Sequence, residues 1–355
     1  MNSSPISFVD LDLILAQTRE LWDEMRGQRV FITGGTGFFG CWLVESFCHI
    51  NRELELGAQV TVLSRNPAKF SAKAPHLAND PAVTLHVGDV RNFDFPTGEF
   101  RFVIHAATET TGMQASDELY STIVSGTERT LDFASQSGTR KFLLASSGAV
   151  YGTQPTEITH LSESYACAPD QTSAYALGKL ASEQLCAERQ QAARAKGVEF
   201  EAKIARCWAF CGPHLPLDAH FAIGNFIGDA LAGRAISIGG DGTPRRSYLY
   251  AADLATWLWT ILFRAPTPEP INVGSAHDVS IRELAEIVAA TLAPATTIHT
   301  AKQAVAGATV SRYVPSVERA ENLLGLRATV DLAEAIRRTT EWHRRADQLQ
   351  FGQRL

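Results

Sequence analysis

The sequence predicts an α/β fold: a doubly wound parallel sheet with helices on both faces, followed by a smaller, interleaved C-terminal α/β lobe. Short apolar runs typical of buried strands alternate with helical patterns, an order that favours a parallel sheet. In addition, the first strand leads through a glycine-rich turn into an apolar-faced helix at 41–50. The predicted strands of the sheet are 30–33, 59–63, 83–87, 102–107 and 141–147, with a helix at 127–137 before the last.

The glycine-rich turn carries Gly34, Gly37 and Gly40, with two residues between successive glycines. Glycines between a strand and a helix let the backbone approach a pyrophosphate, whose charge then lies at the helix N-terminus. The spacing differs from the G-x-G-x-x-G of most dinucleotide dehydrogenases. We therefore expect a dinucleotide to contact this turn, at Gly34, Thr36, Gly37, Phe38, Phe39 and Gly40.

The end of the second strand indicates which dinucleotide is bound. An acidic residue for the ribose 2′-hydroxyl is usual there in NAD-binding proteins, but Ser64 and Arg65 stand in its place. A hydroxyl and a guanidinium suit a 2′-phosphate. The pair favours NADP over NAD, and the less favoured alternative is that Arg65 is a solvated surface arginine. The fourth strand ends in Ala106 and Ala107, whose small side chains allow a cofactor to lie close.

A candidate catalytic group follows the fifth strand. Ser147 lies at the strand end, and Tyr175 and Lys179 are spaced i and i+4 on a helix expected to begin near Thr172. Such residues share one helix face, so the ammonium can lie close to the phenol. A neighbouring cation lowers the pKa of tyrosine from about 10 and makes it a better acid/base.

Composition excludes several classes of function. The chain has 355 residues, 45% of them hydrophobic, and a formal net charge of −6. This mild acidity argues against nucleic-acid binding, and no run approaches the roughly 20 apolar residues of a membrane span. The N-terminus lacks the pattern of a secretory signal, and the scattered cysteines fit no metal or redox motif. We expect a cytoplasmic protein with no metal, no nucleic acid and no membrane partner.

A series of motifs between about residues 28 and 330 resembles the extended short-chain dehydrogenase/reductases of the NAD-dependent epimerase/dehydratase family, which modify nucleotide sugars. The motifs are Thr33–Gly40, Gly88–Val90, His105–Ala107, Ser146–Gly152, Tyr175 with Lys179, Arg206 with Gly212 and Pro213, Gly240–Asp253 and Ile271–Ser275. The resemblance implies a Rossmann fold and a nucleotide-sugar substrate.

The resemblance also implies a role for individual residues. Ser147 would hydrogen-bond the reacting sugar oxygen, Tyr175 would be the acid/base, and Lys179 would bind the nicotinamide ribose. Asp89 and Val90 would contact the adenine, and Arg246 the substrate's diphosphate. Arg312 is a second candidate for a phosphate or ribose contact, with a solvated arginine as the alternative.

Departures from the family pattern bear on the reaction. The 4,6-dehydratases follow the catalytic hydroxyl with Asp-Glu, whereas this chain has Gly148 and Ala149, which cannot transfer protons. Dehydration is therefore not expected. Ala209 and Ile123 replace asparagines of the family pattern, so the substrate pocket differs in detail.

Three regions are expected: an N-terminal helical extension (1–27), an NAD(P)-binding domain with the catalytic residues (28–213) and a mainly substrate-binding lobe (214–355). Helices are predicted at 8–26, 251–264, 280–292, 316–325 and 331–346, and short strands near 236–239, 247–250 and 270–273. The family resemblance and an apolar face on 176–190 favour a homodimer.

Together these observations predict a nucleotide-sugar 4-epimerase or 4-ketoreductase that transfers hydride at a sugar carbon, expected to be C4. Two alternatives remain open: an oxidoreductase of a non-sugar alcohol or ketone, and a non-catalytic dinucleotide-binding regulator with the same fold.

Overall fold

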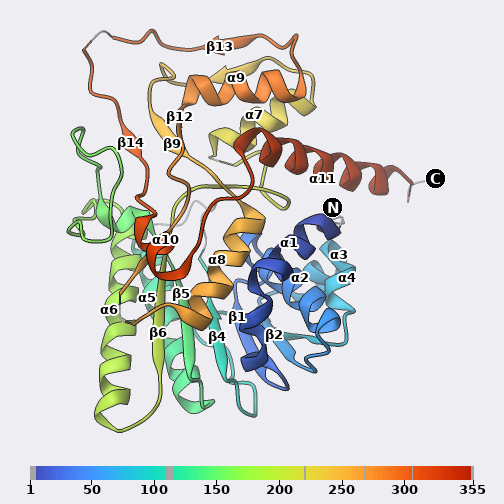
Figure 1. Cartoon of the computed structure of the whole chain (residues 1–355), viewed down its shortest axis with the longest axis vertical. Coiled ribbons are helices and arrows are strands. Elements are labelled where there is room, and N and C mark those ends of the chain that lie inside the picture. The colour runs from blue at the N-terminus through green and yellow to red at the C-terminus, as the bar shows by residue number, and fades with distance from the viewer. Residues whose placement is uncertain (1–4, 109–115, 220, 268, 306, 353–355) are drawn as a thin grey trace.

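The computed structural model describes residues 5–108, 116–219, 221–267, 269–305 and 307–352 (Figure 1). Within these residues, seven parallel strands form the main sheet in the order β11-β6-β5-β4-β1-β2-β3. The reversal of strand order beside β1 is that of a doubly wound sheet. The strands are β1 (Arg29–Thr33), β2 (Gln59–Ser64), β3 (Val83–Val87), β4 (Phe102–His105), β5 (Lys141–Ser147), β6 (Glu201–Cys207) and β11 (Ile271–Val273). The predicted fold class is confirmed.

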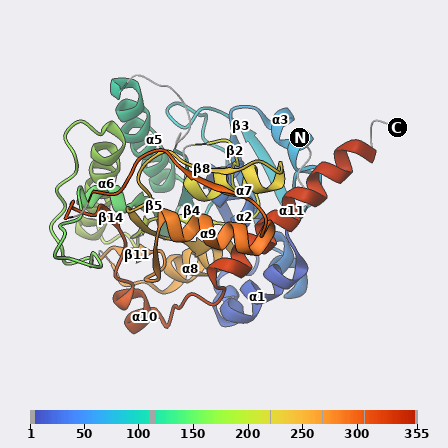
Figure 2. The same cartoon turned by 90° about the horizontal axis from the view of Figure 1, so that it is seen from above.

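Helices cover both faces of this sheet (Figure 2). Helices α5 (Ser116–Gln136) and α6 (Ala174–Ala195) pack on one face, and α2 (Phe38–Glu53) and α8 (Ala251–Arg264) on the other. Outside α2 and α8 lies the N-terminal segment, which forms α1 (Phe8–Thr18) and the 3₁₀ helix η1 (Arg19–Met25). The sheet is thus buried on both sides, which explains why its strands are apolar runs rather than alternating ones.

Strand β1 illustrates how the two halves of the core are built. Val30 and Ile32 belong to the apolar cluster on the α2 and α8 side, whereas Phe31 belongs to the cluster under α5 and α6. Successive side chains of a strand point to opposite faces, so one short apolar run contributes to both layers.

The C-terminal half supplies a smaller lobe above the carboxyl ends of the main strands (Figure 1). Its helices are α7 (Ala222–Leu231), α9 (Ile281–Leu292) and α11 (Leu332–Gly352), with α10 (Glu318–Leu324) lower down. Its short strands form two small sheets: β8 (Ile236–Ile238) pairs with β13 (Ile298–Thr300), while β9 (Arg245–Ser247) lies between β12 (Asp278–Ser280) and β14 (Arg312–Tyr313). Strand β11 returns to the main sheet, so the lobe and the sheet interleave along the chain.

Some element boundaries differ from those predicted. The single strand expected at 247–250 is two strands, because β9 pairs within the lobe and β10 (Leu249–Tyr250) pairs with β7 (Phe210–Cys211). Helix α5 begins at Ser116, well before the predicted 127. The remaining short helices are α3 (Pro67–Lys73), α4 (Pro75–Ala78) and η2 (Gly148–Tyr151). No helix among the described residues has both the length and the apolarity needed to cross a membrane.

Candidate active site

The glycine turn between β1 and α2 is shaped by close backbone contacts. Gly34 has a φ of +73°, and a Cβ built on it would lie 2.5 Å from the carbonyl carbon of Ala106. A Cβ on Gly40 would lie 2.2 Å from the carbonyl oxygen of Gly34. Gly37, in contrast, is exposed and forms the N-cap of α2. The outer glycines therefore permit the turn itself, and the middle one leaves open the place where a phosphate could approach the helix N-terminus.

Phe38 and Phe39, predicted to line the turn, begin α2 and are half-buried. The Phe39 ring makes an edge contact with Phe210, with 5.0 Å between the centroids. The carbonyl oxygen of Thr36 accepts a hydrogen bond of 3.3 Å from Lys73. These contacts fix the start of the helix.

At the end of β2, Ser64 is buried and its hydroxyl accepts a 3.2 Å hydrogen bond from the amide of Asn66. Arg65 is exposed, and its charge helps to lower the pKa of Asp89, after the larger effect of the Arg91 hydrogen bond. Arg91 donates to both carboxylate oxygens of Asp89, at 2.8 and 3.1 Å. Two guanidiniums thus lie beside Asp89. The sequence analysis did not single out Arg91, although its position two residues after Asp89 could have suggested a contact between the two.

The end of β4 is held by a buried histidine. The His105 ring bonds Thr33 at 2.8 Å and Thr127 at 3.1 Å, and burial lowers its pKa to about 3, so it is neutral. The Thr33 hydroxyl also accepts a hydrogen bond of 3.3 Å from the amide of Ala107. This network ties the first and fourth strand ends together beside the glycine turn, with Ala106 in contact with Gly34. Val90 reaches the same region and packs against Gly126 of α5.

Ser147 and Tyr175 lie together, as the sequence suggests. Ser147 is buried at the end of β5, where its hydroxyl accepts a 3.1 Å hydrogen bond from the amide of Ala149. The Tyr175 phenol, near the start of α6, lies beside the Ser147 hydroxyl. Burial raises the pKa of Tyr175 above 10.0, and the nearby Ser147 hydroxyl opposes that rise. At neutral pH the phenol therefore keeps its proton in this state of the protein.

Lys179 lies one helical turn further along α6 and is buried. Its ammonium donates to the hydroxyl of Thr108 at 2.6 Å and to the carbonyl of Ala145 at 2.8 Å. It lies 5.9 Å from the centroid of the Tyr175 ring, and burial lowers its pKa to about 8. Lys179 thus lies near the Tyr175 ring, with its two hydrogen bonds directed to Thr108 and Ala145. Thr108, which sequence reasoning missed, fixes its position.

A second tyrosine reaches this group from the smaller lobe. Tyr313 on β14 lies beside Ser147, whose hydroxyl opposes the rise in the Tyr313 pKa, and its ring lies 4.3 Å, centroid to centroid, from that of Trp208. A Cβ built on Gly148 would lie 2.6 Å from Trp208 and 2.8 Å from the Tyr313 hydroxyl. The two aromatic side chains therefore fill the space beside Gly148. Nothing in the local sequence signals this, because Tyr313 is far from Ser147 along the chain.

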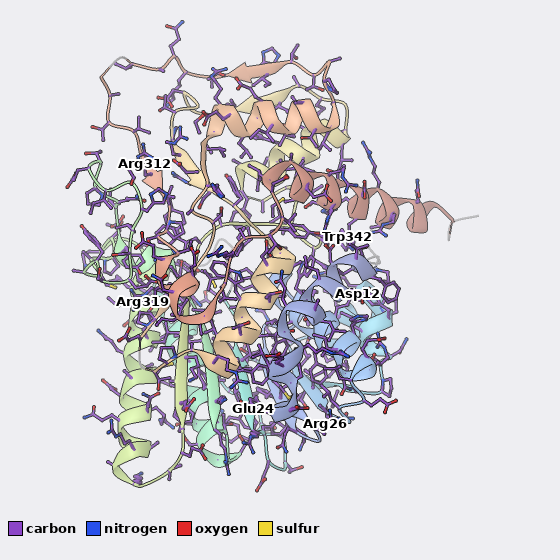
Figure 3. The ribbon with its side chains drawn as sticks, viewed as in Figure 1. Asp12, Glu24, Arg26, Arg312, Arg319 and Trp342 are labelled. Carbon is purple, nitrogen blue, oxygen red and sulfur yellow. The ribbon has the colours of Figure 1, made fainter. Side chains whose placement is uncertain are left out.

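The two arginines predicted to bind substrate lie on opposite faces of the small sheet. Arg246 shares the face of its strand partner Tyr313, and its guanidinium lies 6.0 Å from the centroid of that ring. Arg312, labelled beside β14 in Figure 3, precedes Tyr313 and so points the other way. It pairs with Asp278 at 3.0 Å. The structure thus brings Arg246, but not Arg312, to the Tyr313 side.

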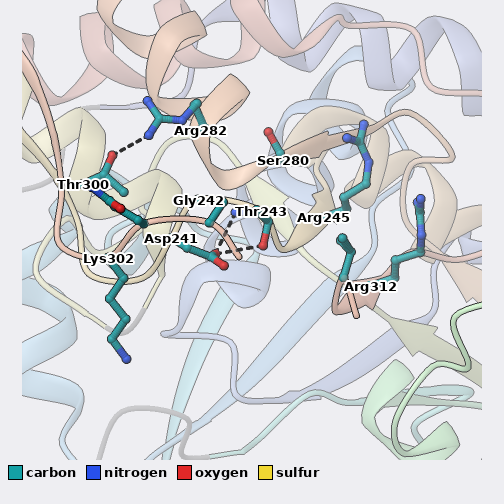
Figure 4. Close-up of a pocket in the computed structure, with 12 residues that line it drawn as sticks. Asp241, Gly242, Thr243, Arg245, Ser280, Arg282, Thr300, Lys302 and Arg312 are labelled. Carbon is teal, nitrogen blue, oxygen red and sulfur yellow. Dashed lines mark hydrogen bonds between the residues drawn. The ribbon is translucent and has the colours of Figure 1, made fainter. Parts of the chain in front are cut away.

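Arg312 instead lines a cavity of about 600 Å³ in the smaller lobe (Figure 4). Arg245, Arg282 and Lys302 also line this cavity. Arg282 is held by Thr300 at 2.8 Å, and Arg245 by Asp278 and Glu283. Because acidic partners offset much of this positive charge, the substrate contact of Arg312 stays a prediction.

The side chains and backbone at the strand ends fit a nicotinamide dinucleotide. The exposed Gly37 at the start of α2 offers a place for a pyrophosphate, and Arg65 and Arg91 offer cations at the end of β2. Lys179 and Tyr175 lie at the end of β5. In the described part of the chain, no three histidine, cysteine or acidic side chains lie close enough together to hold a metal ion.

The fold and the turn between β1 and α2 define a dinucleotide-binding α/β protein. More specifically, the chain belongs to the NAD dependent epimerase/dehydratase family, whose model matches residues 30–274. It is 29% identical over 276 residues to UDP-glucuronic acid decarboxylase 1 of Arabidopsis thaliana, a match that covers 76% of this chain and 60% of that protein. It is 26% identical over 324 residues to dTDP-glucose 4,6-dehydratase of Streptomyces antibioticus, covering 89% of this chain and 92% of that one.

Among solved structures, the chain is similar to MoeE5 in complex with UDP-glucuronic acid and NAD. The TM-score is 0.72 and the identity 25%, over 90% of this chain and 99% of that one. The expected family is therefore confirmed.

Proposed function

We propose that this protein is a nucleotide-sugar oxidoreductase that moves hydride at a sugar carbon, C4, and works as a 4-epimerase or 4-ketoreductase. The observation that carries the proposal is the cluster of Ser147, Tyr175 and Lys179 at the carboxyl end of β5. Relatives named for UDP-glucuronic acid and dTDP-glucose support a nucleotide-sugar substrate.

In this proposal a nicotinamide coenzyme, preferably NADP, supplies the hydride acceptor or donor. Ser147 donates a hydrogen bond to the reacting oxygen and orients it. Tyr175 gives its proton to that oxygen during reduction and takes it back during oxidation. Lys179, when protonated, favours the phenolate. Arg246 would bind the substrate's diphosphate through charge-assisted hydrogen bonds.

Gly148 and its neighbours support the exclusion of 4,6-dehydration. A dehydratase needs an acid and a base next to the catalytic hydroxyl, and here Trp208 and Tyr313 occupy the space beside Gly148. Ala149 offers no proton donor either. One of the relatives is a dehydratase, so the proposal rests on these residues and not on the family.

Decarboxylation is the second candidate, because several relatives are UDP-glucuronic acid decarboxylases. Oxidation at C4 of a uronic acid gives a ketone β to the C6 carboxylate. The C5–C6 bond can then break, carbon dioxide leaves, and its electron pair passes into the ketone as an enolate that is protonated at C5. The same Ser147 and Tyr175 would serve this reaction.

One assay separates these activities. Purified protein is incubated with UDP-glucose or UDP-glucuronic acid, with and without NADPH or NADP, and products are identified by chromatography. One keto sugar formed for each NADP reduced indicates a reductase running in reverse, two interconverting epimers without net redox change an epimerase, and released carbon dioxide a decarboxylase. Tyr175→Phe should lower each activity by about 10²-fold or more; unchanged turnover in this variant would refute the catalytic assignment.

The homodimer remains a proposal. Of the apolar residues on α6 that favour it, Leu180 and Leu185 also pack within the subunit.

A further inference from the structure

Tyr313 is placed beside Ser147 by the small sheet of the C-terminal lobe. Strand β14 runs parallel to β9, with Tyr313 opposite Arg246. Its ring centroid lies 6.0 Å from the Arg246 guanidinium and 4.3 Å from the Trp208 ring. The absence of a side chain at Gly148 leaves room for the phenol, since a Cβ there would lie 2.8 Å from its oxygen.

The Ser147 hydroxyl accepts a hydrogen bond from the amide of Ala149, at 3.1 Å, and the phenols of Tyr175 and Tyr313 lie beside it, the Tyr313 oxygen against Gly148. A serine hydroxyl has one proton to donate and two lone pairs that accept. The amide can only donate, so it takes one lone pair. If both phenol bonds are made at once, one phenol must donate to Ser147 and the other must accept from it.

The surroundings of the two phenols decide which one donates. Tyr313 faces the Arg246 cation, the Cys207 thiol and Tyr175, and burial raises its pKa above 10.0. It therefore keeps its proton throughout the neutral range and can donate permanently. Tyr175 faces Cys207 and Ser147, with the Lys179 ammonium 5.9 Å from its ring centroid. It is the phenol that must lose and regain a proton in the proposed reaction.

We propose that Tyr313 is a positioning residue, whose phenol donates to the Ser147 oxygen and so keeps the Ser147 proton directed at Tyr175 and the reacting sugar oxygen. This inference rests on the proposed function and adds to it a contribution from the smaller lobe. Without the Tyr313 proton, the Ser147 hydroxyl has a free lone pair and can turn its own proton away. Tyr175 then loses part of the hydrogen bond that favours its phenolate.

The test is Tyr313→Phe, which retains the ring and removes only the hydroxyl. With UDP-glucose and UDP-glucuronic acid as probes, we expect kcat to fall about tenfold and KM to change less than about twofold, because one hydrogen bond acting on the reacting oxygen is lost. The limb of the pH profile that reports Tyr175 should move to higher pH. Tyr165→Phe, in the same apolar cluster, is the matched control and should keep the parent profile.

A double-mutant cycle shows whether Tyr313 acts through Ser147. In a Ser147→Ala background, Tyr313→Phe should cause little further loss, since the oxygen it positions is gone. An unchanged kcat and pH profile in Tyr313→Phe, or fully additive losses in the double variant, would overturn the inference. If Ser147→Ala is too slow to measure, the pH profile of Tyr313→Phe decides.

Failure of the proposed function has a different signature. In that case the parent protein turns over neither sugar, or Tyr175→Phe and Ser147→Ala retain parental turnover. A role for Tyr313 only in the size of the pocket is also distinguishable, because phenylalanine preserves the ring and would leave both kcat and the pH profile unchanged.

Discussion

At the scale of single residues, the ammonium of Lys179 is a charge that the proposed function needs, and it lies in the protein interior, where a charge is unfavourable. Its ammonium is buried, and its two hydrogen-bond partners, Thr108 and the Ala145 carbonyl, are neutral. Burial consequently lowers its pKa from 10.5 to about 8. Near pH 8 a small change in its surroundings, such as a bound anion, alters the fraction that is charged.

This shift predicts a pH-dependent stability. Between about pH 8 and 10.5 the unfolded chain holds the Lys179 proton and the folded protein has released it. Lys179 therefore makes the free energy of unfolding rise with pH in that window, by at most ~1.4 kcal/mol per unit. Buried tyrosines and cysteines act in the opposite direction, so the measurement compares urea unfolding of the parent and Lys179→Met. The variant should lose this contribution; parallel curves for the two proteins would contradict the pKa shift.

Arg65 is the residue on which the proposed preference for NADP depends. Arg65→Ala should weaken NADP binding by about tenfold or more and change NAD binding little, because only NADP has a 2′-phosphate to pair with the guanidinium. Titration calorimetry with each dinucleotide measures both affinities. Arg91→Ala is the companion variant, since the Arg91 guanidinium also lies beside Asp89. Equal losses for the two dinucleotides would rule out the 2′-phosphate role.

At the scale of elements, helix α6 presents three side chains along one face: Tyr175, Lys179 and Glu183, at i, i+4 and i+8. Glu183 is buried and pairs with Arg206 of β6 at 2.7 Å, and it accepts a hydrogen bond from Ser146 of β5. The carboxylate thus ties the helix to the two strands below it. The position of Tyr175 relative to Ser147 depends on this connection.

Glu183→Ala should lower the free energy of unfolding by about 3–5 kcal/mol, because it leaves the buried Arg206 charge without its partner. Replacing both residues, as Glu183→Leu with Arg206→Met, should recover much of the loss, since no unpaired charge remains. Chemical denaturation measures both effects. Should the single variant prove as stable as the double one, the pair does not hold the helix as we describe.

Strands β1 to β5 of the main sheet could be predicted because buried parallel strands are apolar runs separated by clear helical patterns, whereas β6, which carries Glu201, Lys203 and Arg206, was not predicted. Strand 141–147 and helix 251–264 were predicted at their observed bounds. Strands of two or three residues, such as β14, have no periodicity to detect, and only pairing across the sheet defines them. Contacts between segments far apart in the chain leave no local pattern either. The sequence therefore indicates Ser147, Tyr175 and Lys179 but neither the place of Tyr313 nor the pairing of Glu183 with Arg206.

At the scale of the whole molecule, the two ends of the chain are joined at one side of the structure (Figure 1). Asp10 of α1 is buried, and it accepts hydrogen bonds from Tyr250 at 2.8 Å and from Arg338 of α11. Helix α1 lies outside residues 30–274, which match the family model. It nevertheless packs on α8 and α2, so the N-terminal extension connects the main sheet to the last helix of the smaller lobe.

Asp10→Ala tests this connection. It should lower the free energy of unfolding by about 2–4 kcal/mol, because it leaves the buried Tyr250 hydroxyl and the Arg338 guanidinium without their shared acceptor. Asp23→Ala, in the adjoining 3₁₀ helix η1, removes an exposed carboxylate that pairs with the exposed Arg26 at 3.3 Å and should cost less than about 1 kcal/mol. Urea midpoints measure the difference, and kcat below the transition should match the parent for both variants, since neither residue contacts Ser147 or Tyr175. Equal stability losses in the two variants would show that the Asp10 contacts between α1 and α11 contribute no more to the free energy of unfolding than an ordinary surface pair.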